Sequence, residues 1–334
     1  MGTLQADVET LAADGFSGVV RVDHAGEVQL AAAYGFAHRG LAVANTLDTQ
    51  FAVASGSKTL TALGVMSLVE DGTLALSTTA RSVLGADLPL IRDDVKVEHL
   101  LAHRSGIGDY LDENAGYDVD DYAMPVPVQQ LVTTEDFLAV LDGYETQFPA
   151  GERFAYNNGG YVVLALIAER ASGVPFHELI DRRVCEPAGM VDSAFLRSDE
   201  LPGRAALGYL ATGDGSRTNV FHLPVRGTGD GGIYTTVADI SSFWAALFSG
   251  RIVSAETVAE MVRPRSTDPE AAKRYGLGFW LAKTGDVAML EGSDAGVSFW
   301  SAHDPGTSVT STVISNTTDA AWPIARLLRE RLSS

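Results

Sequence analysis

The stretch FAVASGSKTLTALGVMSLVEDG, residues 51–72, joins a short apolar strand directly to a long apolar helix. Strand-type residues fill positions 51–54, and turn-type residues follow at once. Gly72 then marks the end of the helix. The apolar positions inside the helix are Leu60, Leu63, Val65, Leu68 and Val69. This spacing predicts a mostly buried helix that begins at Ser55, immediately after a strand.

The segments on both sides of this stretch indicate the fold. Residues 4–14 predict a short amphipathic helix, and residues 17–37 predict a β-hairpin that turns at Ala25-Gly26. The signal is mainly helical from 73 to 205 and returns to short strands after about 205. One helix at 237–250 interrupts these late strands, with a capping signature at Thr236 and Asp239, and a last helix closes the chain.

Strands at both ends of the chain with helices between them predict an α/β protein of the α+β type. We expect one antiparallel β-sheet, built from both termini and flanked by helices, with a mainly helical region inserted in the middle. The expected sheet domain comprises residues 1–72 plus 206–334, and the expected helical domain comprises residues 73–205. The active site should lie at the interface of the two.

The net charge of the chain limits the kinds of binding partner that we expect. Lys plus Arg total 24 against 43 Asp plus Glu, which gives a formal net charge of -19. A field of that sign repels phosphate backbones and anionic lipid heads, so neither nucleic acid nor membrane is an expected partner. The expected partner is a small molecule, and the sequence does not indicate an oligomeric state.

The cysteine content and the N-terminal residues predict whether disulfides form and where in the cell the protein is found. Cys185 is the single cysteine of the chain, so no intrachain disulfide forms, and its apolar surroundings predict a buried filler. Residues 1–15 show neither a basic start nor an apolar signal-peptide core. We therefore expect a cytoplasmic location. The histidines show no metal-binding spacing, and no metal or other cofactor is expected.

Ser55 and Lys58 carry the chemistry that this sequence suggests. A serine hydroxyl is a poor nucleophile until a nearby base removes its proton. Lys58 lies three residues after Ser55, so both side chains project from the same side of the helix. Ser-x-x-Lys is a known catalytic signature. The alternative is that Ser55 is an ordinary helix cap and Lys58 a solvated charge, and only the wider sequence decides against it.

At this point the chain resembles the serine β-lactamase and penicillin-binding-protein superfamily. It is most similar to the branch that contains class C β-lactamases, family VIII esterases and D-peptidases. The resemblance covers nearly the whole chain and rests on blocks in the family's order. These blocks are DTQFAVASGSKTLTALGVMSLVEDGTLAL (48–76), VEHLLAHRSGI (97–107), FPAGERFAYNNGGYVVLALIAERASG (148–173), GDGGIYTTVADISSFWAALFSG (229–250) and YGLGFWL (275–281).

The resemblance implies roles for a second element, Tyr156-Asn157-Asn158. Tyr156 would lie beside Ser55, share or receive its proton and pass that proton to the leaving group. Asn158 would hold Lys58 and the acyl side chain of the substrate by hydrogen bonds. Without the family pattern, the same residues read as a loop before a helix, with Asn158 as its N-cap.

The third element departs from the family pattern. Relatives carry Lys-Thr-Gly or His-x-Gly here, and the aligned residues of this chain are Leu290-Glu291-Gly292. Leu290 cannot bind a substrate carboxylate, and Glu291 would repel an anion. Tyr156 also has one cation fewer to lower its pKa, which leaves more of the base role to Lys58. The resemblance still implies an oxyanion hole from the N–H groups of Ser55 and of Ser293, which follows Gly292.

The predicted function is therefore a serine hydrolase that forms a Ser55 acyl-enzyme with esters or amides. We favour a β-lactamase-like carboxylesterase for small uncharged esters, because Leu290 removes the recognition of anions. The open alternatives are a β-lactamase, a D-alanyl-D-alanine carboxypeptidase or D-aminopeptidase, an acyltransferase, and a non-catalytic binding homologue. GTGDGG at 227–232 matches a dinucleotide-binding pattern, but a strand-like segment follows where a helix is required.

Overall fold

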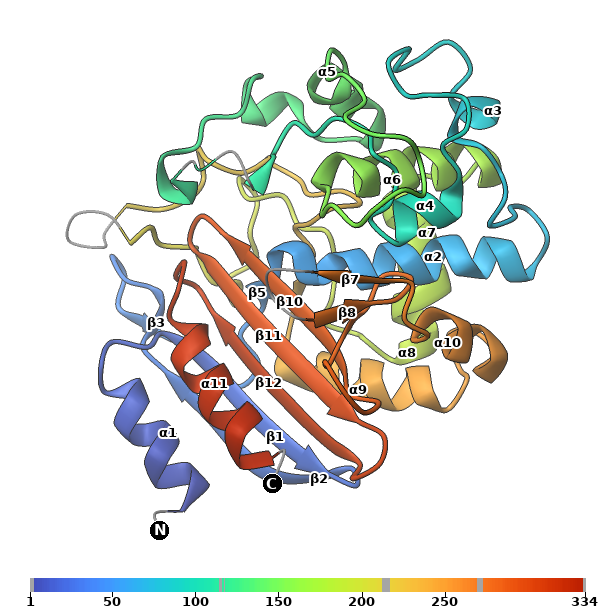
Figure 1. The fold of residues 1–334 in the computed structure, drawn as a ribbon. Coiled ribbons are helices and arrows are strands. Elements are labelled where there is room, and N and C mark those ends of the chain that lie inside the picture. Colours follow the sequence, from blue (N-terminus) through green and yellow to red (C-terminus); the bar gives the residue numbers. More distant parts are fainter. Residues whose placement is uncertain (1–2, 114–115, 117, 212–216, 269–272, 333–334) are drawn as a thin grey trace.

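The computed structural model describes residues 3–113, 116, 118–211, 217–268 and 273–332. Within these residues, one eight-stranded antiparallel sheet has the order β2-β1-β12-β11-β10-β9-β8-β7 (Figure 1). The N-terminal hairpin pairs with the last strand of the chain, so the predicted sheet from both termini is confirmed. The strands are β1 (Gly18–His24), β2 (Glu27–Tyr34), β7 (Ser266–Asp268), β8 (Lys273–Tyr275), β9 (Trp280–Leu281), β10 (Ala288–Asp294), β11 (Val297–Asp304) and β12 (Val309–Ser315).

The alternation of side chains along β1 separates two hydrophobic cores. Val19 packs into the main core on one face, while Val20 and Val22 pack into a smaller core on the other. Helices α1 (Leu4–Ala12) and α11 (Ala321–Leu332) cover the face with the smaller core (Figure 1). Helix α9 (Val237–Phe248), whose N-cap Thr236 accepts from the Asp239 N–H as predicted, packs on the opposite face.

Helix α2 (Lys58–Glu70) lies between the sheet and the remaining helices, and it packs against α6 (Asn158–Ser172). Its residues from Lys58 to Leu68 are all buried, as the apolar pattern predicts. The other helical elements are η1 (Ala54–Ser57), α3 (Ala80–Leu84), α4 (Val97–Leu101), η3 (Val119–Asp121), η4 (Val128–Gln130), η5 (Thr134–Phe137), α5 (Leu138–Leu141), α7 (Phe176–Ile180), η6 (Asp181–Cys185), α8 (Glu186–Ala188) and α10 (Ala255–Met261). The division into a sheet domain and a 73–205 helical domain stays a prediction.

Two short pairings complete the framework around the start of α2. Strand β5 (Phe51–Ala52) pairs with β6 (Tyr234–Thr235), and β3 (Phe36–His38) pairs with β4 (Val43–Ala44). The predicted single helix from Ser55 is in fact a 3₁₀ turn, η1, followed by α2. None of the helices in the described part of the chain combines the length and apolar composition that crossing a membrane requires.

Candidate active site

Ser55 lies in η1, at the junction between β5 and α2. Ala54 precedes it with a φ of 45°, a left-handed conformation that is unfavourable for a residue with a side chain. The junction is fixed by its neighbours, because the N–H of Val53 donates to the Ile233 carbonyl at 3.1 Å. The backbone therefore holds the Ser55 hydroxyl at the boundary of two cavities, both of which it lines.

The amine of Lys58 makes three polar contacts. Its Nζ lies 2.8 Å from Ser55 Oγ, 2.7 Å from Asn158 Oδ1 and 2.8 Å from the backbone oxygen of Asp230. The last two atoms are acceptors only. A neutral amine has two N–H donors for these acceptors and one lone pair, which then points at the Ser55 hydroxyl. The arrangement suits a base that removes the Ser55 proton.

The surroundings of Lys58 favour that neutral form. Its side chain is 2% exposed, and burial lowers the pKa of the amine below its usual value. Nearby carboxylates, with Asp230 first among them, act in the opposite direction on this pKa. The downward direction prevails because burial penalises the ammonium more than these charges stabilise it.

Tyr156 lies beside Ser55 and Lys58. It lines the second cavity together with Ser55, and the Lys58 Nζ lies 5.0 Å from the centre of its ring. Burial raises the pKa of the Tyr156 phenol well above its usual value. A phenol held neutral in this way is suited to donate a proton, whereas the base role falls to Lys58.

His103 holds the segment that carries Tyr156. Its Nδ1 accepts from the N–H of Asn157 at 3.1 Å, and its carbonyl accepts from the N–H of Ala155 at 2.9 Å. The rings of His103 and Tyr156 lie 4.3 Å apart. Trp280 stacks on Tyr156 with an interplanar angle of 12°. His103 thus fixes the backbone on both sides of Tyr156, which is a structural role.

The start of α6 positions Asn158. Asn157, rather than Asn158, is the N-cap, and its side chain accepts from the Gly160 N–H at 2.6 Å. Asp109 adds to this cap, because its two carboxylate oxygens accept from the N–H groups of Asn158 and Gly159 at 2.6 and 2.8 Å. With its backbone capped, Asn158 directs Oδ1 to Lys58.

The third element lies on β10, against η1. A Cβ built on Gly292 would meet the Val53 carbonyl oxygen at 2.1 Å and the Ser55 nitrogen at 3.0 Å. Only glycine allows this approach, which brings the backbone before Ser293 close to the Ser55 amide. The place that the predicted alignment gives to Gly292 is thus beside the nucleophile, where an oxyanion hole requires it.

Leu290 and Glu291 point to opposite faces of β10. Leu290 is 2% exposed and belongs to the main core, so this side chain presents no group to a substrate. Glu291 lines the second cavity but forms ion pairs with Lys273 and, at 3.4 Å, with Arg329. The expected repulsion of anions by Glu291 is therefore reduced by these two partners.

We predict that Gly292→Ala lowers kcat/KM for ester hydrolysis by about 100-fold, because the added methyl group separates β10 from the Ser55 amide. This loss corresponds to one weakened oxyanion contact. Gly203→Ala is the matched control, since a Cβ there meets nothing within 4 Å and its φ is not positive. Steady-state kinetics on both folded variants test this prediction. Equal kcat/KM values for the two variants would show that Gly292 has no role in the active site.

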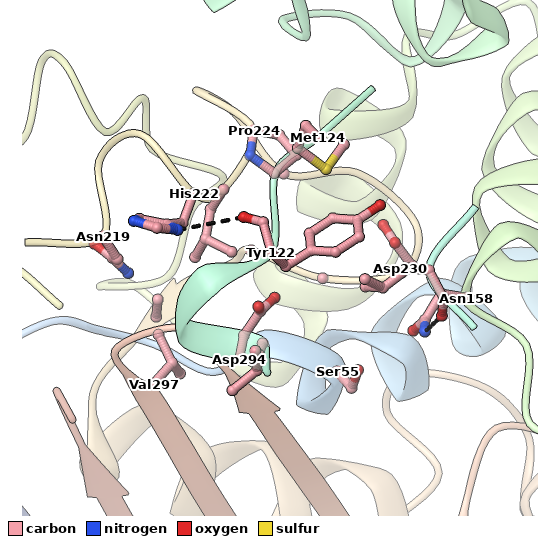
Figure 2. A pocket seen from close by; sticks show the side chains of 18 of the residues that line it. Ser55, Tyr122, Met124, Asn158, Asn219, His222, Pro224, Asp230, Asp294 and Val297 are labelled. Atoms are coloured by element: carbon pink, nitrogen blue, oxygen red, sulfur yellow. Dashed lines mark hydrogen bonds between the residues drawn. The ribbon is translucent and has the colours of Figure 1, made fainter. Parts of the chain in front are cut away.

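Two cavities meet at Ser55. The first, of about 260 Å³, extends past Asn158, Asp230 and Asp294 toward Met124 and Pro224 (Figure 2). The second, of about 530 Å³, is lined by aromatic side chains that include Tyr156 and Trp280. We expect a substrate with its carbonyl at Ser55 to place one part in each cavity. Tyr156 lines the second, so that cavity suits the leaving group and the first suits the acyl group.

Several residues of this site lack any predicted role in the sequence. Asp230 lies in the glycine-rich segment 227–232, and Glu113 and Asp294 carry no motif of their own. His222 also lines the first cavity, with Nδ1 3.3 Å from the Tyr122 carbonyl oxygen (Figure 2). Trp280 lines the second cavity, while Trp300 belongs to the smaller core.

The chain matches the family model described as Beta-lactamase over residues 4–332. It is 29% identical over 272 residues to the putative penicillin-binding protein PbpX of Bacillus subtilis, an alignment that covers 80% of this chain and 63% of that protein. It is 28% identical to esterase EstB of Burkholderia gladioli, covering 79% of this chain and 74% of the esterase.

Among solved structures, the penicillin-binding protein from Bacillus halodurans superposes with a TM-score of 0.91 at 33% identity. That alignment covers 98% of this chain and 99% of the other. By contrast, the chain spans less than two thirds of the length of PbpX. The family match over nearly the whole chain agrees with the fold and with the arrangement around Ser55. The chain belongs to the beta-lactamase family of proteins.

Proposed function

We propose that this chain is a serine hydrolase that cleaves esters or amides through an acyl-enzyme on Ser55, and we favour a carboxylesterase. The observation that carries the proposal is the Lys58 Nζ, 2.8 Å from the Ser55 hydroxyl with its two other contacts taken by acceptors. The phenol of Tyr156, whose pKa is raised by burial and which lines the second cavity together with Ser55, supports it. The name of the relative esterase EstB agrees with this chemistry.

The proposed reaction has two halves. Ser55 Oγ attacks the substrate carbonyl carbon while Lys58 Nζ takes its proton, and the oxyanion accepts from the N–H groups of Ser55 and Ser293. The carbon–oxygen or carbon–nitrogen bond of the substrate then breaks. Tyr156 donates its proton to the departing atom and regains one from Lys58. Water then attacks the acyl carbon and gives a proton to Lys58. The bond between that carbon and Ser55 Oγ breaks, Oγ takes the proton from Lys58, and the acid leaves.

The walls of the site favour substrates that are not anionic. Leu290 supplies no cation for a carboxylate, and the first cavity is lined by Glu113, Asp230 and Asp294. A β-lactam or a peptide C-terminus carries a carboxylate, so these substrates are disfavoured relative to neutral esters. The cytoplasmic location and the two-domain division stay predictions from the sequence.

Intact-mass analysis after exposure to three substrate classes tests the proposal. The panel contains p-nitrophenyl esters, a cephalosporin and a peptide that ends in D-Ala-D-Ala. We expect a covalent acyl adduct and steady release of p-nitrophenol with the esters, and little or no adduct with the other two classes.

Each other outcome points to one of the alternatives. Rapid cephalosporin turnover would instead assign a β-lactamase, and cleavage of the peptide a D-peptidase. Product other than free acid, after an alcohol is added, would assign an acyltransferase. Folded protein that forms no adduct with any of the three classes would contradict the proposed function and leave a non-catalytic binding protein.

A further inference from the structure

Three of the described residues line both cavities. They are Ser55, Ser293 and Glu113. The nucleophile and the residue whose N–H contributes to the oxyanion hole have to lie at this boundary, because the acyl carbon of the substrate is held there. Glu113 lies at the same boundary, although the two halves of the reaction give it no role.

The carboxylate of Glu113 is held close to the catalytic groups. Its Oε1 accepts from the side-chain amide of Asn158 at 3.2 Å, and Asn158 Oδ1 in turn lies 2.7 Å from Lys58 Nζ. Glu113 makes no second hydrogen bond and no ion pair with the residues that the structure describes. The side chain is exposed, so its other oxygen can accept from a water molecule in the second cavity.

The other carboxylates around the two cavities are less suited to hold a water molecule beside the acyl carbon. Glu291 lines the second cavity but is engaged in two ion pairs. Asp268 lies on the edge strand β7 and does not reach the first cavity. Asp230 and Asp294 line only the first cavity, where we expect the acyl group. Glu113 is therefore the carboxylate that borders both the acyl group and the space left by the leaving group.

The hydrolysis of the acyl-enzyme needs two hydrogen-bond acceptors around one water molecule. One O–H of the water points to Lys58 Nζ, because the lone pair of this amine no longer faces a hydroxyl once Ser55 is acylated. The second O–H needs its own acceptor, so that a lone pair of the water oxygen is directed at the acyl carbon.

We infer that Glu113 is this second acceptor, and that it favours the release of an acid over the transfer of the acyl group to an alcohol. The inference rests on the proposed function, because it concerns the acyl-enzyme on Ser55. The water oxygen bonds to the acyl carbon, one proton passes to Lys58 Nζ, and the other stays on the oxygen and donates to Glu113. The bond to Ser55 Oγ then breaks, and Oγ takes the proton back from Lys58. Glu113 starts and ends as a carboxylate.

An alcohol differs from water in this geometry. It has a single O–H, which Lys58 needs as the proton donor, so no O–H remains for Glu113. Removing the carboxylate should therefore slow hydrolysis of the acyl-enzyme and leave alcoholysis almost unchanged. The ratio of the two products reports this difference directly, because both products come from the same acyl-enzyme.

Rapid mixing of Glu113→Gln with p-nitrophenyl butyrate, with and without methanol, tests the inference. We expect the rate constant of deacylation to fall by about 10- to 100-fold, the effect of one hydrogen bond to a charged group, while acylation changes by less than about threefold. Butyryl-Ser55 should accumulate in the intact mass. In methanol, the ratio of methyl butyrate to butyrate should rise by the same factor as deacylation falls.

A second variant and a control complete the test. The amide oxygen of glutamine is still a weak acceptor, so Glu113→Ala, which removes the acceptor, should raise the product ratio at least as much. Glu27→Gln changes an exposed glutamate on β2, outside both cavities, and should leave the ratio at its wild-type value. An unchanged ratio in both folded Glu113 variants would overturn the inference. Equal losses in acylation and deacylation would also overturn it, because Glu113 would then act only through Asn158 and Lys58.

The same measurements keep the inference separate from the proposed function. Hydrolysis that depends on Ser55, with a product ratio that does not respond to Glu113, contradicts only the role of Glu113. Failure of the wild-type protein to hydrolyse the ester, or hydrolysis that survives in Ser55→Ala, contradicts the proposed function and with it the inference.

Discussion

Replacing Ser55 with alanine is expected to lower kcat/KM for p-nitrophenyl butyrate by about 10⁴-fold or more. The methyl group cannot form the acyl-enzyme, and Lys58 loses the hydroxyl that its Nζ contacts. Steady-state kinetics under identical conditions give the ratio directly. The expected loss is in kcat, because the cavities that bind the substrate keep their shape.

Ser77→Ala is the matched control for this variant. Ser77 is exposed and lies outside both cavities, so its replacement should leave the rate unchanged. Ser55→Ala removes only one oxygen, which lines the cavities and not the core, so circular dichroism should show an unchanged fold. A folded Ser55→Ala protein with activity within tenfold of wild type would mean that another group attacks the substrate.

The second large effect is expected for Lys58→Met, which keeps the length and apolar stem of the side chain but removes the amine. We expect kcat/KM to fall by about 10³-fold, the contribution of a well-placed general base. The pH profile should change as well. Because burial lowers the Lys58 pKa, wild-type activity should rise with pH as this amine loses its proton, and the variant should lack that rise.

Lys283→Met separates the loss of the base from the loss of a positive charge. Lys283 is exposed and lies away from Ser55, so this variant should keep both the rate and the pH profile. If Lys58→Met retained the wild-type profile, the pH-sensitive group would lie elsewhere, and Tyr156 would become the candidate base.

Ser55 and Lys58 could be predicted because the signals that identify them lie within a few neighbouring residues of the sequence. A strand that runs into a helix places Ser55 at the junction, and a three-residue spacing places Lys58 beside it. The family blocks then supplied Tyr156 and Asn158, although they lie about 100 residues away. The sheet from both termini followed from the distribution of strand signals, and the pairing of β1 with β12 confirms it.

The three carboxylates that line the first cavity were not predictable from the same signals. Glu113, Asp230 and Asp294 come from three distant segments, and each lies among residues that read as a loop or strand end. Their common effect appears only when the fold brings them to one cavity. The same holds for Trp280, whose stacking on Tyr156 depends on the meeting of β9 with the segment before α6.

The third element shows that a motif read residue by residue can assign an effect on substrate charge to the wrong side chains. The sequence attributed the loss of anion recognition to Leu290 and its neighbour Glu291. In the fold, Leu290 is part of the core, and Glu291 is paired with Lys273 and Arg329. The carboxylates that face a substrate are instead those of Glu113, Asp230 and Asp294, which line the first cavity. The direction of the expected selectivity is the same, but different residues produce it.

Labelling with a p-nitrophenyl alkylphosphonate, followed by intact mass and peptide mapping, addresses the nucleophile itself. If Lys58 and Tyr156 activate the serine between β5 and α2, the wild-type protein gains one phosphonyl group on the peptide that contains Ser55, and Ser55→Ala gains none. Folded wild-type protein that stays unmodified, or that carries the group on a different residue, would contradict the mechanism derived from this structure.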